Sequence, residues 1–154
     1  MGNIDLIHCS STAEIDKRMT AQQTALVQQT WKLFRDINPQ VIGDVFYSKL
    51  FTDEPAVKRL FKAPITAQYK KLIDMISVIV GRLQEIESIT DGIREMGIRH
   101  AGYGVKPQHY KSVGDALLWT LEQGLGQDWN QEVQEAWIVC YQWLADTMIE
   151  ASGY

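Results

Sequence analysis

His100 lies on the apolar face of a predicted helix, and this placement constrains the fold more than any other feature of the chain. Apolar residues precede it at helical spacing, at Met96, Ile93 and Ile89. Burial on such a face disfavours the imidazolium cation and leaves a neutral ring with a nitrogen able to bind a metal. The alternative is a core histidine that is hydrogen-bonded to a backbone carbonyl.

The residues after His100 end one helix and begin another. Gly102, Gly104 and Pro107 interrupt the helical pattern. The pattern then resumes with residues at helical spacing, namely Tyr110, Val113, Leu117 and Leu121. The resulting motif, His-x-x-x-Gly-Val-x-Pro-x-x-Tyr, resembles the haem-ligating segment of globins. From Met19 to the C-terminus the chain is similar to bacterial single-domain globins and to the haem domain of flavohaemoglobins.

The rest of the chain also shows helical periodicity, broken by short segments that contain Pro, Gly or a capping residue. No alternating strand pattern of useful length appears, which predicts an all-α fold. The expected helix starts are Thr20, Asn38-Pro39, Asp53-Glu54-Pro55, Thr66, Glu87-Ser88, Pro107 and Asp128-Trp129-Asn130. The inner face of the last helix is expected to carry Val133, Trp137, Cys140, Leu144 and Met148. The resemblance implies the globin fold, a three-over-three helical sandwich around haem.

Length and composition fit one globular domain. With 154 residues and a mass of 17.6 kDa, the chain has room for a single substantial core and none for an additional catalytic domain. The net charge of −4 predicts no general attraction to nucleic acid. No segment approaches the roughly 18 uninterrupted apolar residues of a membrane span. Cys9 and Cys140 are too few for a disulfide scaffold and are expected to stay unbridged in a cytoplasmic setting.

The first 18 residues differ from the rest of the chain. Residues 1–18 show no sustained periodicity and are interpreted as a flexible extension ahead of a globin domain at 19–154. Met1-Gly2-Asn3 is similar to the start of an N-myristoylation site, but Leu6 stands where that motif requires Ser or Thr. A plain tail, a lipidated anchor and a leader segment are the alternatives.

The resemblance implies a ligand pocket with two polar side chains. Tyr47 aligns with a tyrosine on the second helix of bacterial globins, and Gln68 aligns with the distal position on the helix that roofs the pocket. Because a glutamine amide is a poor iron ligand, the resemblance implies an open sixth iron site for a diatomic ligand. The alternatives are a Tyr47 hydroxyl bonded to a backbone carbonyl and a solvated Gln68.

Further residues are expected to contact the haem. Phe61 matches the phenylalanine that globins stack on the haem plane, and Leu72 aligns with the pocket position one turn beyond Gln68. Lys71 aligns with a position that often reaches a haem propionate, and Val105 comes after His100 in the motif. Simple core packing is the alternative for Phe61, and a solvent-directed side chain is the alternative for Lys71.

On the other side of the haem, flavohaemoglobins use a tyrosine and a glutamate to brace the proximal histidine. Tyr110 matches the tyrosine, whereas the position of the glutamate falls at Ser152. The nearest acid, Glu150, is about half a turn away. This departure puts a strongly activating proximal side in question. Core packing is the alternative role of Tyr110.

The resemblance implies a haem b protein, with His100 as the iron ligand, that reversibly binds O2. The first alternative is a nitric oxide dioxygenase, in which O2 oxidises NO to nitrate and an external reductase returns the iron to the ferrous state. The second is a haem-based sensor or interaction module that uses residues 1–18 to report on bound O2, NO or CO. The sequence has no hydrolase elbow, phosphate loop or aromatic-basic platform for nucleic acid.

Overall fold

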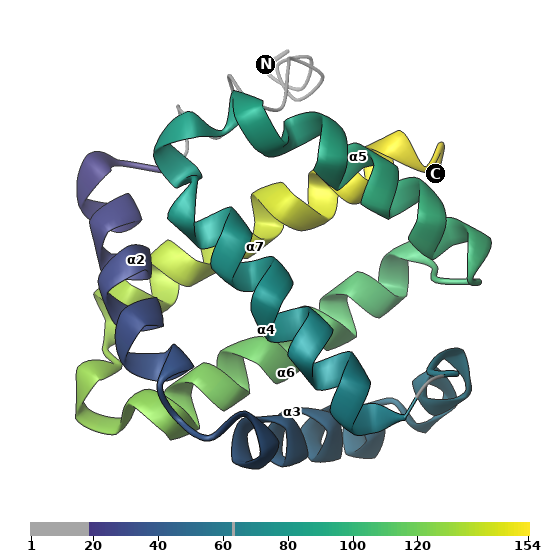
Figure 1. Ribbon diagram of the computed structural model, residues 1–154, viewed down its shortest axis with the longest axis horizontal. Helices are drawn as coiled ribbons and strands as arrows, with labels where there is room; N and C mark the ends of the chain where they lie inside the picture. Colours follow the sequence, from purple (N-terminus) through teal and green to yellow (C-terminus); the bar gives the residue numbers. More distant parts are fainter. Residues whose placement is uncertain (1–18, 63) are drawn as a thin grey trace, which may run out of the picture.

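The computed structural model describes residues 19–62 and 64–154, with only the backbone at Thr66. All regular elements in this part of the chain are helices, which confirms the expected all-α fold. In Figure 1, α4 and α5 lie over α6 and α7. The α-helices are α2 (Ala21–Arg35), α3 (Pro39–Asp53), α4 (Ile65–Gly81), α5 (Glu87–Gly102), α6 (Pro107–Leu125) and α7 (Gln131–Ala151). The 3₁₀ helices are η2 (Pro55–Leu60), η3 (Leu83–Glu85) and η4 (Gly126–Asp128).

Several helix starts coincide with capping residues in the sequence. The Thr20 hydroxyl accepts a hydrogen bond from the Gln23 N–H at 3.0 Å, and the Gln23 side chain accepts one from the Thr20 N–H at 3.0 Å. This reciprocal pair is a capping box, and it fixes the start of α2. Pro39 and Pro107 are the first residues of α3 and α6, where the fixed φ of proline suits entry into a helix.

Two details differ from the sequence prediction. The predicted cap at Thr66 is wrong, because α4 already begins at Ile65, directly after Pro64. On α7, Leu144 is only half-buried, whereas its neighbour Trp143 is 1% exposed. The inner face of α7 is therefore wider than the predicted stripe, since this helix packs against α2, α5 and α6 together.

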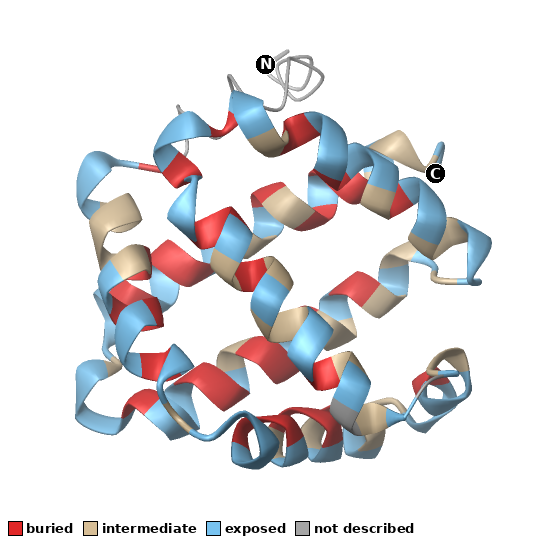
Figure 2. Ribbon diagram, viewed as in Figure 1, coloured by how far each residue is buried: buried red, intermediate tan, exposed pale blue. Residues whose placement is uncertain are grey.

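Buried residues lie on every α-helix (Figure 2), and the largest fully buried side chains include Trp31 on α2 and Trp137 and Trp143 on α7. The indole N–H of Trp137 donates to the Thr30 hydroxyl at 2.9 Å, and that of Trp31 donates to the Ser77 hydroxyl at 2.8 Å. Both indoles thus bury their rings while their polar atoms keep partners. These bonds connect α2 to α7 and to α4, and they hold these three helices in place relative to one another.

Helix α5 approaches α7 very closely. At Gly97 an added Cβ would lie 2.4 Å from the backbone oxygen of Met148, so only glycine fits this contact. The close approach fixes the depth of the helix that carries His100 relative to α7.

Cys140 is buried in α7, and burial raises the pKa of its thiol to about 12. The predicted absence of a bridge to Cys9 remains a prediction, because Cys9 lies outside the described residues. Within the described part of the chain, no helix is long and apolar enough to cross a membrane.

Candidate functional site

His100 lies in the last turn of α5 and is half-buried. Its Nδ1 is 2.8 Å from the backbone oxygen of Met96, which can only accept a hydrogen bond. Nδ1 therefore carries the proton, and Nε2 keeps a free lone pair. Burial lowers the pKa of His100; the bond to Met96 acts in the opposite direction, and the Arg99 charge lowers the pKa further. The result is a neutral imidazole with one nitrogen available to a metal.

The turn after His100 is held by main-chain hydrogen bonds. The Val105 N–H donates to the His100 carbonyl at 3.0 Å, across Gly104, whose φ of 96° suits glycine. The other nearby histidine has a different use: Nδ1 of His109 accepts from the Lys106 N–H at 2.8 Å, at the start of α6. Of these two histidines, His100 is the one whose Nε2 has a free lone pair for a metal.

Tyr47, predicted to face the ligand, is buried on α3 with 5% of its surface exposed. Burial raises the pKa of Tyr47 to about 12, so the hydroxyl remains a donor across the physiological pH range. This hydroxyl makes no hydrogen bond to any described residue, and no described backbone carbonyl holds it. Its ring contacts a set of aromatic rings at centroid distances of 4.6 to 5.5 Å, formed by Phe46, Phe51, Phe61 and Tyr69.

Of the predicted haem contacts, Phe61 is brought directly against Tyr47. It comes directly after η2, is half-buried, and meets the Tyr47 ring edge-on at 5.2 Å. Gln68 and Leu72 lie one turn apart on α4 and are both half-buried, whereas Lys71 is exposed. The Gln68 amide, like the Tyr47 hydroxyl, has no hydrogen-bond partner among the described residues. The Tyr47 hydroxyl, beside the half-buried Phe61 ring, and the Gln68 amide on α4 are therefore both free to donate hydrogen bonds.

Tyr69 is a site residue that sequence reasoning missed. It comes directly after Gln68 on α4, is 3% exposed, and its ring lies 4.6 Å from that of Tyr47. The ring occupies the space that a side chain at Gly43 would need, at the contact of α3 with α4. Its hydroxyl is buried without a hydrogen-bond partner in the described structure. Tyr69 lies four residues before Ile73 and seven before Ile76, on the apolar stripe of α4, and this spacing is the sequence signal that could have indicated its burial.

On the proximal side, Tyr110 is 8% exposed, and burial raises its pKa to about 12, with nearby Tyr154 adding to the effect. Val105 is half-buried, and its carbonyl accepts a hydrogen bond from the Tyr154 hydroxyl at 2.9 Å. Ser152 points at the α5 backbone, whereas Glu150 is exposed. The acid that the family resemblance would require on this side is therefore replaced by a neutral hydroxyl.

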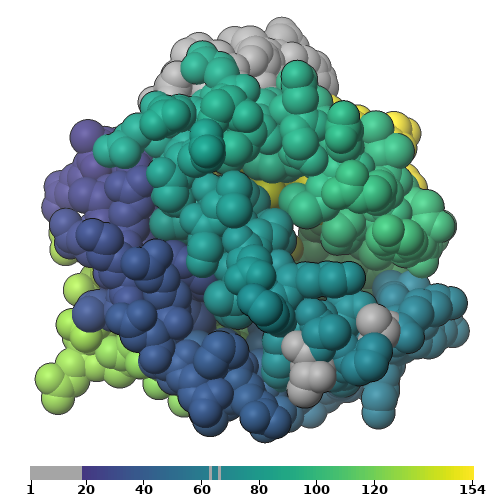
Figure 3. All heavy atoms as spheres, in the orientation of Figure 1, coloured from purple at the N-terminus to yellow at the C-terminus, as the bar shows by residue number. Residues whose placement is uncertain are grey.

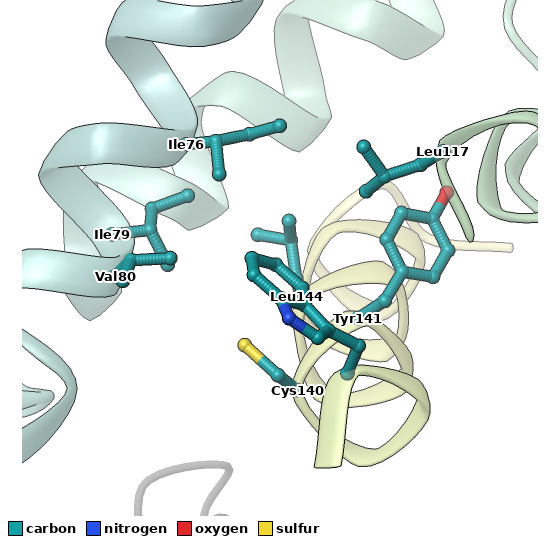
Figure 4. A pocket seen from close by; sticks show the side chains of 8 residues that line it. Ile76, Ile79, Val80, Leu117, Cys140, Tyr141 and Leu144 are labelled. Atoms are coloured by element: carbon teal, nitrogen blue, oxygen red, sulfur yellow. The ribbon is translucent and has the colours of Figure 1, made fainter. Parts of the chain in front are cut away.

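The two groups of predicted site residues lie on different helices. Figure 3 shows the surface hollowed between α4, the helix that carries Gln68, and α5, the helix that carries His100. A cavity of about 20 Å³ lies between α4, α6 and α7 (Figure 4). Its lining is mainly aliphatic, and the Tyr141 hydroxyl donates to the Tyr110 carbonyl at 2.6 Å. With so few polar partners this cavity is unsuited to ordered water.

His100 offers a single nitrogen to a metal. Within residues 19–62 and 64–154, no group of three or more His, Cys, Asp or Glu side chains is placed to hold a metal. A single histidine with a free nitrogen instead fits an iron whose remaining in-plane ligands come from a macrocycle.

The chain is similar in sequence to known proteins. The flavohemoprotein of Vibrio cholerae serotype O1 is 25% identical over 138 residues, which cover 88% of this chain and 35% of that protein. The chain therefore spans about a third of the length of this relative. Leghemoglobin 29 of Vicia faba is 26% identical over 138 residues, which cover 82% of this chain and 93% of that protein.

The fold is also similar to that of solved structures. An engineered carbene transferase, described as a putative nitric oxide dioxygenase from Rhodothermus marinus, has a solved structure that superposes with a TM-score of 0.78 at 23% identity. The match covers 88% of this chain and 94% of the other, and it confirms the predicted globin fold. The profile of the family described as Globin matches residues 44–148. Since this match spans more than half of the chain, the protein belongs to the globin family.

Proposed function

We propose that this globin binds haem b through Nε2 of His100 and reversibly binds O2 on the opposite face. The observation that carries the proposal is the 2.8 Å contact from Nδ1 of His100 to the Met96 carbonyl, which leaves Nε2 free to bind a metal. Haem, when bound, supplies an iron with one open position for a diatomic ligand. The residues of this chain hold the cofactor and set the surroundings of that position.

Several side chains are suited to hold the cofactor. Phe61, Leu72 and Val105 are half-buried, and in this proposal they contact the apolar macrocycle. Lys71 is exposed on α4, where its ammonium group would reach a propionate from the solvent side. Tyr110, buried on α6, would pack on the proximal side near His100.

The distal residues supply hydrogen bonds rather than a second iron ligand. Tyr47 keeps its proton because burial raises its pKa to about 12, and Gln68 offers an amide N–H. Neither group has a partner among the described residues, so both can donate to a diatomic ligand. A pocket with two such donors favours O2, which accepts hydrogen bonds better than CO does.

The test is the absorption spectrum of the purified protein with and without dithionite, O2 and CO. We expect ferrous, oxy and carbonmonoxy spectra, and we expect His100→Ala to lose the normal ferrous spectrum and to retain haem poorly. His109→Ala is the matched control. The His109 ring accepts a hydrogen bond at the start of α6, so this substitution should leave the spectrum unchanged. A protein that stays colourless after reconstitution with haemin, or a His100→Ala spectrum equal to that of the parent, would overturn the proposal.

A second candidate is nitric oxide dioxygenase activity, supported by the similarity to a flavohemoprotein. In this reaction NO and O2 combine to nitrate, and one electron from an external reductase completes each turnover. The expected distinction is turnover. An O2 carrier consumes NO once per haem, whereas a dioxygenase consumes NO continuously when a reductase and its reduced nicotinamide dinucleotide are supplied. Consumption that stops at one equivalent under these conditions would exclude the dioxygenase.

A further inference from the structure

Basic residues are concentrated in two segments of this acidic chain. Residues 58–71 contain five Lys or Arg, residues 99–111 contain three, and neither segment contains an Asp or Glu. The rest of the chain carries the other seven of the 15 basic residues and all 19 acidic residues, a net charge of −12 against +8 for the two segments. The basic residues of the first segment are Lys58, Arg59, Lys62, Lys70 and Lys71, and those of the second are Arg99, Lys106 and Lys111. All eight are exposed, and together they are called the basic rim.

The two segments lie on one side of the molecule and meet there. Figure 1 shows η2 and the start of α4 on the same side as the turn from α5 to α6. An added Cβ at Gly104 in this turn would lie 3.6 Å from a side-chain carbon of Leu60 in η2, which is van der Waals contact. The Ser112 hydroxyl on α6 also donates to the Glu54 carboxylate, just before η2, at 3.3 Å. The basic rim is therefore one surface region, although its residues come from two distant parts of the sequence.

Most of the charge on the basic rim is not neutralised within the chain. Lys70 and Lys111 form ion pairs with Asp74 and Asp115 at 3.2 and 2.9 Å. The other six residues of the rim make no ion pair with any described residue. Their charges are therefore available to attract an acidic partner and to orient it before contact.

The basic rim lies on the same segments as residues proposed to hold haem. Residues 58–71 include Phe61, and residues 99–111 include His100. The Tyr103 side chain is 61% exposed, and its ring centroid is 6.1 Å from that of His100. Exposed tyrosines are frequent at the centres of protein interfaces, where charged residues form the border. A protein that contacts Tyr103 and the rim is therefore separated from the proposed iron ligand by a single side chain.

We propose that the basic rim is the docking surface for an electron-transfer protein that has an acidic face and carries a reduced flavin. In the docked pair the flavin loses one electron, and the ferric haem iron gains it and becomes ferrous. This inference rests on the proposed function, because the acceptor is the haem held by His100. An O2 carrier needs this step whenever its iron oxidises, and a nitric oxide dioxygenase needs it in every turnover.

The distribution of charge favours a small acidic protein over an extended anionic surface. A partner protein of ordinary size can cover the basic rim and avoid the rest of the molecule. A membrane or a long nucleic acid would also approach the remainder of the chain, where the net charge of −12 repels it.

Docking is mapped with oxidised flavodoxin, an FMN protein with an acidic surface, as the probe. Amide chemical shifts are followed in the CO-bound ferrous protein or, where the purified protein holds no haem, in the protein as purified. We expect the largest shift changes in residues 58–71 and 99–111 at an ionic strength of about 0.01 M. These changes should disappear in about 0.5 M salt, where the Debye length is about 4 Å.

Electron delivery is measured by stopped flow as the rate at which reduced flavodoxin reduces the ferric protein. Arg59→Glu/Lys62→Glu reverses two charges of the rim outside the residues proposed to hold haem, and it should slow the reaction at least about tenfold at low salt, within the range of electrostatic steering. Lys106→Glu repeats the test on the second segment. In both variants an unchanged CO spectrum shows that the haem site is intact.

The matched control is Lys32→Glu/Arg35→Glu on α2, which lies on the opposite side of the molecule in Figure 1. It reverses one exposed Lys and one exposed Arg and so changes the net charge by the same amount. Because these residues are far from the rim, the rate should fall by less than about twofold.

The outcomes separate the docking surface from the proposed function. Shift changes confined to the rim, with a loss of rate in the rim variants but not in the control, support the docking surface. Equal losses in the rim and control variants, or parent-like rates in both rim variants, overturn it. Binding to phosphatidylglycerol vesicles without any shift change on addition of flavodoxin would assign the rim to a membrane and overturn the redox role. Rim-confined changes in a protein that cannot hold haem would overturn the proposed function but support the docking surface, whereas normal O2 and CO spectra without rim changes would overturn the docking surface alone.

Discussion

Removal of the Tyr47 hydroxyl tests the distal pocket most directly. In Tyr47→Phe the ring stays, and with it the packing against Phe46, Phe51 and Tyr69 at 4.9, 5.5 and 4.6 Å. The hydroxyl bonds no described residue, so its loss leaves no described group without a partner. The substitution thus removes one donor from the pocket and little else, which makes its effect on a bound ligand interpretable.

The magnitude depends on the strength of the lost bond. A hydrogen bond to an acceptor that carries charge is worth about 1.5 to 3 kcal/mol, compared with about 1 kcal/mol for a neutral pair. O2 held at ferrous haem is such an acceptor, and CO is a much weaker one. If the loss appears mainly in dissociation, O2 release should become on the order of ten- to a hundredfold faster. CO release should change much less.

Stopped-flow measurement of O2 and CO release from the parent and the variant is the assay. Tyr69→Phe is measured alongside, since it removes the unbonded hydroxyl of the neighbouring ring on α4 and so tests whether Tyr69 is the donor instead of Tyr47. Gln68→Leu tests the second donor in the same way. Parent-like O2 release in both Tyr47→Phe and Gln68→Leu would refute the donor pair, and equal acceleration of O2 and CO would indicate a widened pocket instead of a lost hydrogen bond.

Three further predictions concern stability and are measured by urea unfolding of the protein without haem. Tyr69→Phe should raise the free energy of unfolding by about 1 to 3 kcal/mol, because the buried hydroxyl has no described partner. A free energy of unfolding below that of the parent would mean that water or another group bonds this hydroxyl. Gly97→Ala should lower the free energy of unfolding by at least about 1 to 3 kcal/mol, since the new methyl group would meet the Met148 backbone, whereas Gly92→Ala on the same helix, with open space around it, should stabilise. Because burial lowers the pKa of His100 below its ordinary value of 6.5, the unfolded chain binds this proton more readily, and stability should fall as the pH drops below about 6.5. His100→Ala should show a shallower fall over this range, and an identical pH profile would contradict a burial effect on this imidazole.

The helices could be predicted from the sequence because their ends are marked locally. Thr20 with Gln23, Pro39 and Pro107 act within one turn of the chain, so their effect does not depend on distant residues. The error at Thr66 has a physical origin of the same kind: two signals, Pro64 and Thr66, compete within three residues, and the proline governs the start.

The candidate site was predicted from two kinds of signal. Apolar residues on its own helix indicate that His100 faces the buried side, whereas its role as haem ligand is implied by the resemblance of the motif after it to globins. The spacing of Tyr69 to Ile73 and Ile76 places it on the apolar stripe of α4, but its contact with α3 could not be predicted, because this contact depends on the absence of a side chain at Gly43. The partner of Ser152 likewise lies 55 residues away in the sequence, and no local pattern indicates it.

The hydrogen bonds around His100 also bear on which globin chemistry this chain supports. The described partner of Nδ1 is a main-chain carbonyl, and the nearby contacts of Ser152 and Tyr154 are made to carbonyls as well. A carboxylate in this place would draw the Nδ1 proton and make the ring a stronger electron donor. A more electron-rich iron favours cleavage of the O–O bond, whereas a neutral histidine favours retention of intact O2. We therefore expect any oxidation of NO by this protein to depend on the distal donors and on the supply of electrons, because the described partner of Nδ1 is a carbonyl and not a carboxylate.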